Sequence, residues 1–345
     1  MKITELHSIN DYKNYSYNYW RELIELGYII YRPVNDKVLV LNTNDFKVEF
    51  EVSLKEKDSF GIQVIGKKIF FQINNTVWRF VSNPYQIIKV FESSEESASI
   101  LSDRYLYGRT FKRRPRVCRN NIVDSISNEI IYSSNEQDYL INFSFPYCLF
   151  QVRFSGEMFY YDLLSASEKW RITVDEGIPG RRFHHFKEEY FIIQKRVKEN
   201  DYNWWADIQK RSLSDGEIDW EIKRGLEHYN ALSNSNEYIG IGGNRIHHFN
   251  SKGDVIYDGR LKEELGISSH LTGVFGDKLV FATHINTNIP ALGLIDLNSY
   301  NLISIKEVEV SEIKSFRIGL DVPCLFENRI YVRDSEDRLR IFEIK

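Results

Sequence analysis

The chain repeats a unit of about 40 residues, built of short strand-like runs, from near residue 60 to its end. Several units contain a tight polar turn that an aromatic residue follows at a nearly fixed distance. The pairs four residues apart are Asn128 and Tyr132, Gly216 and Trp220, and Gly253 and Tyr257, while Ser167 and Trp170 are three apart. A strand-rich repeat of this length is typical of radial blades around a central channel.

Within the repeat, apolar and polar residues alternate over short runs, which is the pattern of half-buried strands. The aromatic residues, mainly 22 Phe and 21 Tyr, favour such strands. The pattern predicts six repeat units, at residues 60–92, 100–134, 145–175, 182–223, 235–260 and 271–309.

The last unit is incomplete, since only two strands, at 329–333 and 338–344, follow residue 326. Closed rings of blades complete their last blade with an N-terminal strand, because closure removes exposed strand edges. Strands predicted between residues 28 and 52 can supply the missing piece and close the ring with 326–345. We therefore predict an all-β β-propeller, with seven blades of four antiparallel strands. Six or eight blades are the alternatives, because predicted strand boundaries shift by several residues.

A short N-terminal helix precedes these strands. Its apolar stripe at steps of three and four is made of Tyr12, Tyr15, Tyr19, Leu23 and Leu26. Asn10 can cap its start and Gly27 can end it, which predicts a helix over 11–26. We expect this helix to pack on the propeller, with a partner-binding helix as the alternative. No Pro-, Gly- or Ser-rich linker divides the chain, so residues 1–345 are predicted to be a single domain.

Two segments resemble the outer hairpin of quinoprotein-like (PQQ-like) propeller repeats, within the wider group of WD40-like propellers. They are Leu-Ser-Asp-Gly-Glu-Ile-Asp-Trp at 213–220 and Asp-Leu-Leu-Ser-Ala-Ser-Glu-Lys-Trp at 162–170, set against a family pattern of the type Leu-Asp-x-x-Thr-Gly-x-x-x-Trp. Residues 296–299, Asp-Leu-Asn-Ser, are a similar copy without the Trp. The resemblance implies that Trp170 and Trp220 fill the space between neighbouring sheets.

The chain departs from the quinone-dependent dehydrogenases of that family. Those enzymes are larger, with eight blades, and often use a vicinal cysteine pair and a calcium site. Here the three cysteines, Cys118, Cys148 and Cys324, are scattered. No cofactor-binding residue carries over, and we expect no cofactor.

Composition excludes several classes of protein. The formal net charge is -4, from 45 basic and 49 acidic residues, so a global basic field for nucleic acid is absent. No run of 18 apolar residues exists to span a membrane, and no secretory signal is visible. The odd number of cysteines indicates reduced thiols, which predicts a cytoplasmic protein.

Candidate catalytic and metal-binding motifs are weak. Two histidine pairs, His184-His185 and His247-His248, share an Arg-x-His-His-Phe context. Adjacent residues of a strand point to opposite faces, so each pair offers one ligand per face, and we expect no metal site. The sequence has no nucleophile elbow or Walker A motif, and no carboxylate pair stands out for glycoside hydrolysis. We expect no catalytic residue.

The first of two candidate partner-binding segments is basic. It runs from Arg109 to Arg119 and its candidate residues are Arg109, Lys112, Arg113, Arg114 and Arg116. Such a patch suits an acidic partner, because guanidinium groups bind carboxylates in a forked geometry. The alternative is a solvated strand and loop, neutralised by nearby glutamates.

The second segment, residues 198–205, changes abruptly from polar to aromatic. Its candidate residues are Tyr202, Trp204 and Trp205. Adjacent tryptophans on a strand face opposite ways, so one of them can be exposed beside Tyr202 as a protein or sugar contact. The alternative is that both tryptophans are buried against the next blade.

These patterns favour a non-catalytic, monomeric, cytoplasmic scaffold that binds a protein partner through its loops. One specific version is a bacterial toxin-neutralising immunity protein. The alternative is a carbohydrate-active hydrolase or lyase with carboxylates at the mouth of the channel. A small-molecule sensor using His184 or His185 is a third hypothesis.

Overall fold

The computed structural model describes most of the chain. The residues outside its description are 11–19, 34–36, 56, 93–96, 103, 113–116, 128, 135–137, 153–155, 175–184, 188, 199–203, 227, 233–234, 286–288 and 311–318. For residues 97–98, 109–112, 117–119, 139, 185–186, 195–198 and 204–205 only the backbone is described.

The chain forms two compact units, which are described one at a time. The middle unit comprises Asn14–Gly180 and the short segment Leu213–Gly216. The terminal unit comprises Met1–Lys13, Arg181–Ser212 and Glu217–Lys345. Whether the two behave as the single domain expected from the sequence stays a prediction.

The described part of the middle unit contains one helix and four antiparallel sheets. The helix is α1 (Trp20–Glu25). The strands are β2 (Tyr28–Tyr31), β3 (Lys37–Asn42), β4 (Val48–Ser53), β5 (Phe60–Ile65), β6 (Lys68–Ile73), β7 (Thr76–Ser82), β8 (Tyr85–Glu92), β9 (Ser97–Ile100), β10 (Tyr105–Lys112), β11 (Val117–Asp124), β12 (Glu129–Ser134), β13 (Asp138–Ser144), β14 (Tyr147–Val152), β15 (Glu157–Asp162) and β16 (Ser167–Thr173). The sheets are β2–β4, β5–β8, β9–β12 and β13–β16, each in chain order.

The terminal unit contains four further sheets. Its strands are β1 (Ile3–Ile9), β17 (His185–Phe186), β18 (Tyr190–Lys198), β19 (Trp204–Ser212), β20 (Ile218–Gly225), β21 (Asn230–Ala231), β22 (Glu237–Gly242), β23 (Arg245–Asn250), β24 (Val255–Arg260), β25 (Thr272–Phe275), β26 (Lys278–Ile285), β27 (Ile289–Asp296), β28 (Asn301–Glu307), β29 (Cys324–Phe326), β30 (Arg329–Arg333) and β31 (Leu339–Ile344). Three sheets follow chain order, and the fourth has the order β1-β31-β30-β29.

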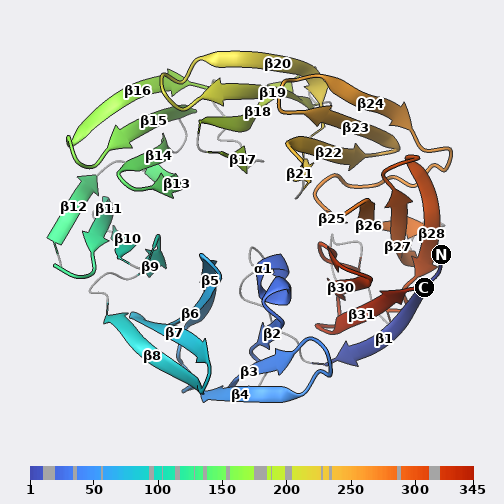
Figure 1. The fold of residues 1–345 in the computed structure, drawn as a ribbon, viewed down its shortest axis with the longest axis horizontal. Helices are drawn as coiled ribbons and strands as arrows, with labels where there is room; N and C mark the ends of the chain where they lie inside the picture. Colours follow the sequence, from blue (N-terminus) through green and yellow to red (C-terminus); the bar gives the residue numbers. More distant parts are fainter. Residues whose placement is uncertain are drawn as a thin grey trace. The chain divides into compact units, whose positions relative to one another are not determined.

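Each sheet is a propeller blade, as Figure 1 shows for the blades of either unit. The prediction of an all-β propeller with four-stranded antiparallel blades is confirmed, but the described residues form eight blades and the predicted number, seven, is wrong. Seven blades have four strands and one, β2–β4, has three.

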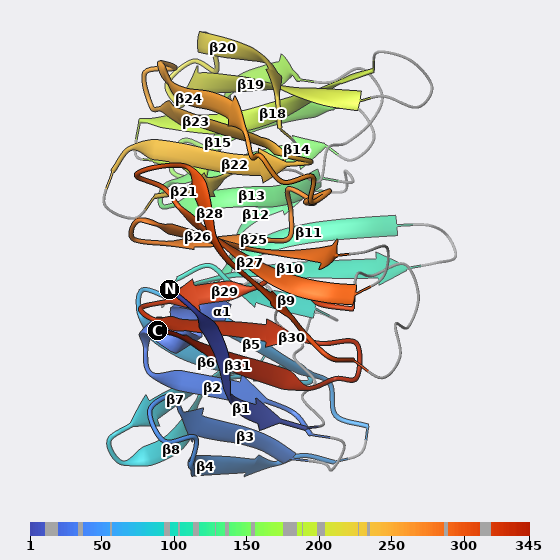
Figure 2. The ribbon, with the colours of Figure 1, turned by 90° about the vertical axis from the view of Figure 1, so that its right-hand side faces the viewer.

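The extra blade follows from how the last blade is completed. Residues 28–53 form the blade β2–β4 and do not pair with 326–345, so the predicted closing strands are wrong. The fourth strand of the last blade is β1, which pairs antiparallel with β31 from Ile3 to Ile9 and lies along it in Figure 2. Of β1 only Ile3 and Ile9 are buried, so it lacks the alternation that marks the other strands.

In the three-stranded blade, the helix α1 occupies the position that the first strand takes in the other blades. Figure 1 shows α1 next to β2, on the side away from β3. Leu23 of α1 is buried, as the predicted apolar stripe requires, and Gly27 ends the helix with a positive φ of 87°. The predicted helix over 11–26 is therefore confirmed only for Trp20–Glu25, and residues 11–19 lie outside the description.

The core lies between successive blades. The middle strands are covered on both faces, so β26 and β27 read as almost continuous apolar runs, with Pro290–Ile295 wholly buried. Buried clusters join each blade to the next within a unit, for example β2–β4 to β5–β8 and β21–β24 to β25–β28. Within each unit, the middle strands of successive blades thus bury their facing sides against each other.

The hairpin between the third and fourth strands, here called the outer hairpin, repeats one design. In five blades an Asp or Asn side chain at the end of the third strand accepts backbone N–H groups two to four residues on, which fixes the turn. These residues are Asn42, Asp124, Asp162, Asn250 and Asp296. Among the described residues, a residue with positive φ lies in this turn in five blades, namely Phe46, Ala166, Gly216, Gly253 and Tyr300.

A β-bulge then falls at the same place in six blades, where one residue of the fourth strand has no partner. In five of these six blades an aromatic residue comes directly after it, and it pairs with the third strand. These residues are Phe50, Tyr132, Trp170, Trp220 and Tyr257.

The two predicted inter-blade tryptophans occupy this position and join one outer hairpin to the next. Trp220 Nε1 donates to the Ser251 carbonyl over 3.0 Å, and Trp170 Nε1 donates to the Leu213 carbonyl over 2.9 Å. Their packing role is confirmed. The residue with positive φ in this turn is Ala166, one residue before Ser167, so Trp170 follows it by four residues, as Trp220 follows Gly216.

Candidate functional site

The basic candidate segment forms a hairpin between the second and third strands of its blade, here called a middle hairpin. β10 and β11 pair from Tyr105↔Asp124 to Lys112↔Val117, which is eight residue pairs. In the next blade of the same unit, β14 and β15 start from the matching pair Tyr147↔Asp162 but make only five pairs. The basic hairpin is therefore longer by three pairs, or about 10 Å of strand.

The aromatic candidate segment lies on a middle hairpin of the terminal unit. β18 and β19 make nine pairs, from Tyr190↔Ser212 to Lys198↔Trp204. In the next blade, β22 and β23 make six, ending at Gly242↔Arg245. Trp204 and Trp205 belong to the three extra pairs, so their backbone continues past the end of the neighbouring hairpin.

The candidate side chains themselves are not described. Arg113, Arg114, Arg116 and Tyr202 lie outside the described residues. Arg109, Lys112, Trp204 and Trp205 are described as backbone only, in the strands β10 and β19. Their partner-binding roles stay predictions, and the structure supplies their position in the blades.

Buried polar contacts fix the base of the basic hairpin. Asn120, the strand partner of Arg109, is fully buried and donates its amide to the carboxylate of Asp138 in the next blade. The Tyr132 hydroxyl donates to the other oxygen of Asp138 over 2.8 Å. Buried polar groups that find partners in this way hold a fixed geometry, so the extra pairs extend from a rigid base.

The aromatic hairpin has a comparable base. Asp207, 5% exposed, accepts Lys223 Nζ at 3.1 Å and the backbone N–H of Arg224 at 3.0 Å. Gln194 Nε2 donates to the carbonyl of Leu226 over 2.8 Å. These groups lie just below the three extra pairs and join β18 and β19 to β20 and the segment that follows it.

The buried carboxylates of the described residues serve structure. Asp124, Asp138, Asp162, Asp207 and Asp334 are the aspartates buried there. Asp124 and Asp162 fix outer hairpins, while Asp138 and Asp207 fix the bases of the middle hairpins. The guanidinium of Arg104 holds the pKa of Asp124 below its usual range. None of these contacts sets two carboxylates about a substrate, as the hydrolase alternative requires.

The second histidine pair shows why adjacent histidines do not share a site. His247 Nδ1 lies 2.7 Å from the Tyr229 hydroxyl, while His248 contacts Tyr300 at 2.8 Å and Glu237 at 3.2 Å. Burial lowers the pKa of His247 to about 4. The Tyr229 hydroxyl also accepts the N–H of Leu226, and with its pKa lowered the buried imidazole of His247 stays neutral.

Of the first pair, His184 lies outside the described residues and His185 is described as backbone only. Across the part of the chain that the structure describes, no group of three or more His, Cys, Asp or Glu residues is placed to hold a metal ion. Within the same residues, no helix is long and apolar enough to cross a membrane.

Comparison with known proteins gives the fold. No family model and no curated protein matches the chain. Among solved structures, the chain is similar to Sqt1 of Saccharomyces cerevisiae, with TM-score 0.59, 8% identity and 100% of both chains covered. It is also similar to the C-terminal WD40 domain of Sif2, with TM-score 0.58, 8% identity, and 99% and 96% covered. A computationally designed protein, Ika8, gives TM-score 0.59 at 9% identity, with 92% and 93% covered.

The likeness to WD40-type structures confirms the resemblance at the level of fold. At 8–9% identity it says nothing of function, because this architecture hosts many unrelated activities. The blades of this chain therefore carry the functional signal, above all the two long middle hairpins that contain the candidate segments; β26–β27 is as long as β10–β11 but contains neither segment.

Proposed function

We propose that the chain is a non-catalytic scaffold that binds a protein partner through its two long middle hairpins, β10–β11 and β18–β19. The observation that carries the proposal is that their length coincides with the two candidate segments, since β26–β27 also makes eight pairs but carries neither segment. Each exceeds the middle hairpin of the next blade by three pairs. Of the candidate residues, Lys112, Trp204 and Trp205 lie in those extra pairs and Arg109 lies next to them. The others lie outside the described residues.

Binding residues are commonly carried by the hairpins and loops at the ends of a rigid scaffold. Rigid bases at Asp138 and Asp207 hold the hairpins in place, which lowers the entropy lost when a partner binds. A tip rich in Arg and a tip rich in aromatic residues offer the residue types that dominate protein interfaces. An acidic partner suits the basic tip.

The specific version, a toxin-neutralising immunity protein in the cytoplasm, requires a toxin as the partner. We further propose that the chain is a monomer when unbound and that it binds neither nucleic acid nor membrane, in keeping with its net charge of -4. A carbohydrate-active enzyme would need paired carboxylates, and no observation favours it.

The test is to shorten each middle hairpin to the length of its neighbour. One variant replaces residues 110–119 by Asn-Gly and another replaces 196–206 by Asn-Gly, since this dipeptide forms tight hairpins. We expect both to fold and to lose a partner that the wild type retains in quantitative affinity purification from host lysate. Charge reversal at Arg113, Arg114 and Arg116 should also weaken that complex, most at low salt.

A matched control changes the opposite end of a blade. Ile218→Ser alters an exposed residue of an outer hairpin and should retain the partner. If both shortened variants bind every partner as the wild type does, the proposal is wrong. A partner with toxic activity in the host would identify the immunity version.

A further inference from the structure

The fourth strand of the last blade is held in an unusual way. β1 pairs with β31 from Ile3↔Ile344 to Ile9↔Leu339, and the register shifts between Glu5 and His7. A shift of one residue turns the following side chains to the other face of the sheet. Ile3 therefore lies on the face of Ile344, and Ile9 on the opposite face.

Little apolar surface anchors β1. Ile3 is 1% exposed and Ile9 8%, but Glu5 to Ser8 between them are exposed, with Leu6 at 44%. By contrast, Pro290–Ile295 of β27 are all buried. Because stability of a strand follows its buried apolar area, β1 is held less firmly than the middle strands of its unit.

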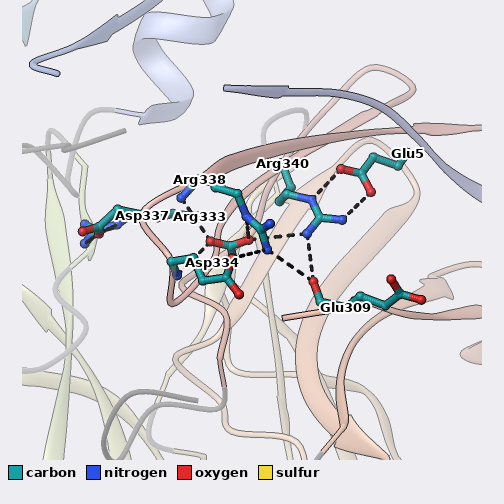
Figure 3. Close-up of polar contacts among 8 residues, drawn as sticks. Glu5, Glu309, Arg333, Asp334, Asp337, Arg338 and Arg340 are labelled. Atoms are coloured by element: carbon teal, nitrogen blue, oxygen red, sulfur yellow. Dashed lines mark hydrogen bonds and ion pairs between the residues drawn. The ribbon is translucent and has the colours of Figure 1, made fainter. Parts of the chain in front are cut away.

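A group of charged residues also anchors β1 and compensates for its small buried apolar area. We call this group the charge clasp; it consists of Glu5, Asp334, Arg338 and Arg340 (Figure 3). The Arg340 guanidinium, whose side chain is 10% exposed, donates through Nε and Nη2 to the two carboxylate oxygens of Glu5. Its Nη1 donates to the carbonyl of Glu309 over 3.0 Å and lies 3.4 Å from Asp334 Oδ2. Forked pairs of this kind are the strongest that Arg makes.

The members of the charge clasp outside β1 keep hydrogen-bond partners when β1 is absent. The Asp334 carboxylate is fully buried, accepts Arg338 Nε at 2.7 Å, and accepts the backbone N–H groups of Glu336 and Arg338 at 3.0 Å each. If β1 leaves, Asp334 keeps Arg338 and Arg340, and Arg340 exchanges Glu5 for water. Loss of β1 therefore leaves no buried charge without a partner. An unpaired buried charge is what usually makes a buried ion pair costly to break.

We propose that β1 is a releasable strap, which detaches from β31 while the rest of the terminal unit stays folded, and that the Glu5–Arg340 pair sets how often it does so. Release frees the backbone groups of β31 that pair with β1. The freed edge then fits an extended segment that places a carboxylate opposite Phe342, within reach of Arg340, because Glu5 of β1 does so. The inference does not depend on the proposed function.

The test is amide hydrogen exchange of the full chain, read by mass spectrometry for β1, β31 and β27. Glu5→Gln keeps the shape of the side chain and removes its charge. We expect amides of β1 to exchange about tenfold faster in this variant, with β27 unchanged, since local opening follows local contacts. Glu343→Gln is the matched control, because Glu343 pairs with the exposed Lys345 at 3.1 Å on the neighbouring strand.

Salt provides a second measurement that needs no substitution. Raising KCl from about 0.05 M to about 1 M shortens the screening length from roughly 14 Å to 3 Å, so β1 of the wild type should exchange several-fold faster and Glu5→Gln should respond less. The strap is refuted if Glu5→Gln leaves β1 as protected as before. It is equally refuted if β1 and β27 lose protection together, because the strand would then open only with the whole unit.

Discussion

Outer and middle hairpins of the same blades follow opposite rules. Third and fourth strands meet in a near-constant arrangement, in which six blades share a bulge at one position and five place an aromatic residue directly after it. Second and third strands meet in hairpins that range from five to nine pairs in the four blades compared. One end of each blade is built to join its neighbour, and the other end is free to vary.

The difference has a physical origin. An outer hairpin must place an aromatic ring against the next turn, as Tyr257 does when it stacks on Tyr300 with 3.8 Å between ring centres. Any change of length there moves the ring and opens a gap between blades. A middle hairpin that extends beyond its neighbour has no such contact to preserve, so its length and composition are open to function.

The strongest test of this comparison sets two tryptophans against each other. Trp220→Ala should lower the free energy of unfolding by about 3 kcal/mol, because it removes the packing on Gly253 and the hydrogen bond to Ser251. Trp205→Ala, in the long middle hairpin, should change it by less than about 0.5 kcal/mol. Urea denaturation measures both, and equal losses would contradict the distinction between the two ends.

Acid should lower the free energy of unfolding through buried histidines that lie outside the long middle hairpins. Burial lowers the pKa of His247 to about 4, and burial with the nearby His270 does the same for His228. Both imidazoles stay neutral in the folded chain, while the unfolded chain binds protons near pH 6.5. Their contribution is thus fully present above pH 6.5 and is lost as the pH falls toward 4.

Urea titrations between pH 7 and 4 test this sign. His247→Gln should flatten the loss of stability toward acid, and His248→Gln, whose partner Glu237 opposes the effect of burial, should flatten it less. An unchanged slope in His247→Gln would show that other groups cause the acid sensitivity.

Much of the fold could be predicted because the outer hairpins carry local signals. Turn residue, positive φ and aromatic residue lie within a few positions of one another, so six units were delimited to within a few residues at most boundaries. β1 carries no such signal, since its exposed middle and its register shift hide the alternation. Pairing of β1 with β31 joins opposite ends of the chain, and no local pattern reports it.

The candidate site could be predicted less fully. The basic and aromatic segments can be identified from the sequence alone, because they are runs of charged or aromatic residues along the chain. Hairpin length relative to a neighbour is a property of register, which the sequence alone does not define here. Polar bases at Asp138 and Asp207 are likewise spatial, since Asn120 and Asp138 meet only when successive blades pack.

Two glycines of one blade allow the outer and middle hairpins to be compared by single substitutions. Gly253 in the outer hairpin and Gly243 in the middle hairpin both have positive φ, at 88° and 59°. An added Cβ would lie 2.9 Å from the Trp220 ring at Gly253 but meets nothing within 4 Å at Gly243. We expect Gly253→Ala to cost about 2 kcal/mol and Gly243→Ala about 1 kcal/mol, measured by urea denaturation. Equal costs would mean that the Trp220 ring can move away from the added Cβ without loss of stability.

A further effect concerns the Asn or Asp side chain that starts the outer turn in five blades. Asn250 Oδ1 accepts the backbone N–H groups of Lys252 at 2.9 Å and Asp254 at 3.0 Å, so Asn250→Ala should lower the free energy of unfolding by about 1 kcal/mol. Asn250→Asp keeps the acceptor, and Asp124 and Asp162 fill the same place in other blades. That variant should therefore stay near the wild type in thermal unfolding. A loss as large as that of Asn250→Ala would show that the amide nitrogen, which donates to Asp254, matters more than the shared turn.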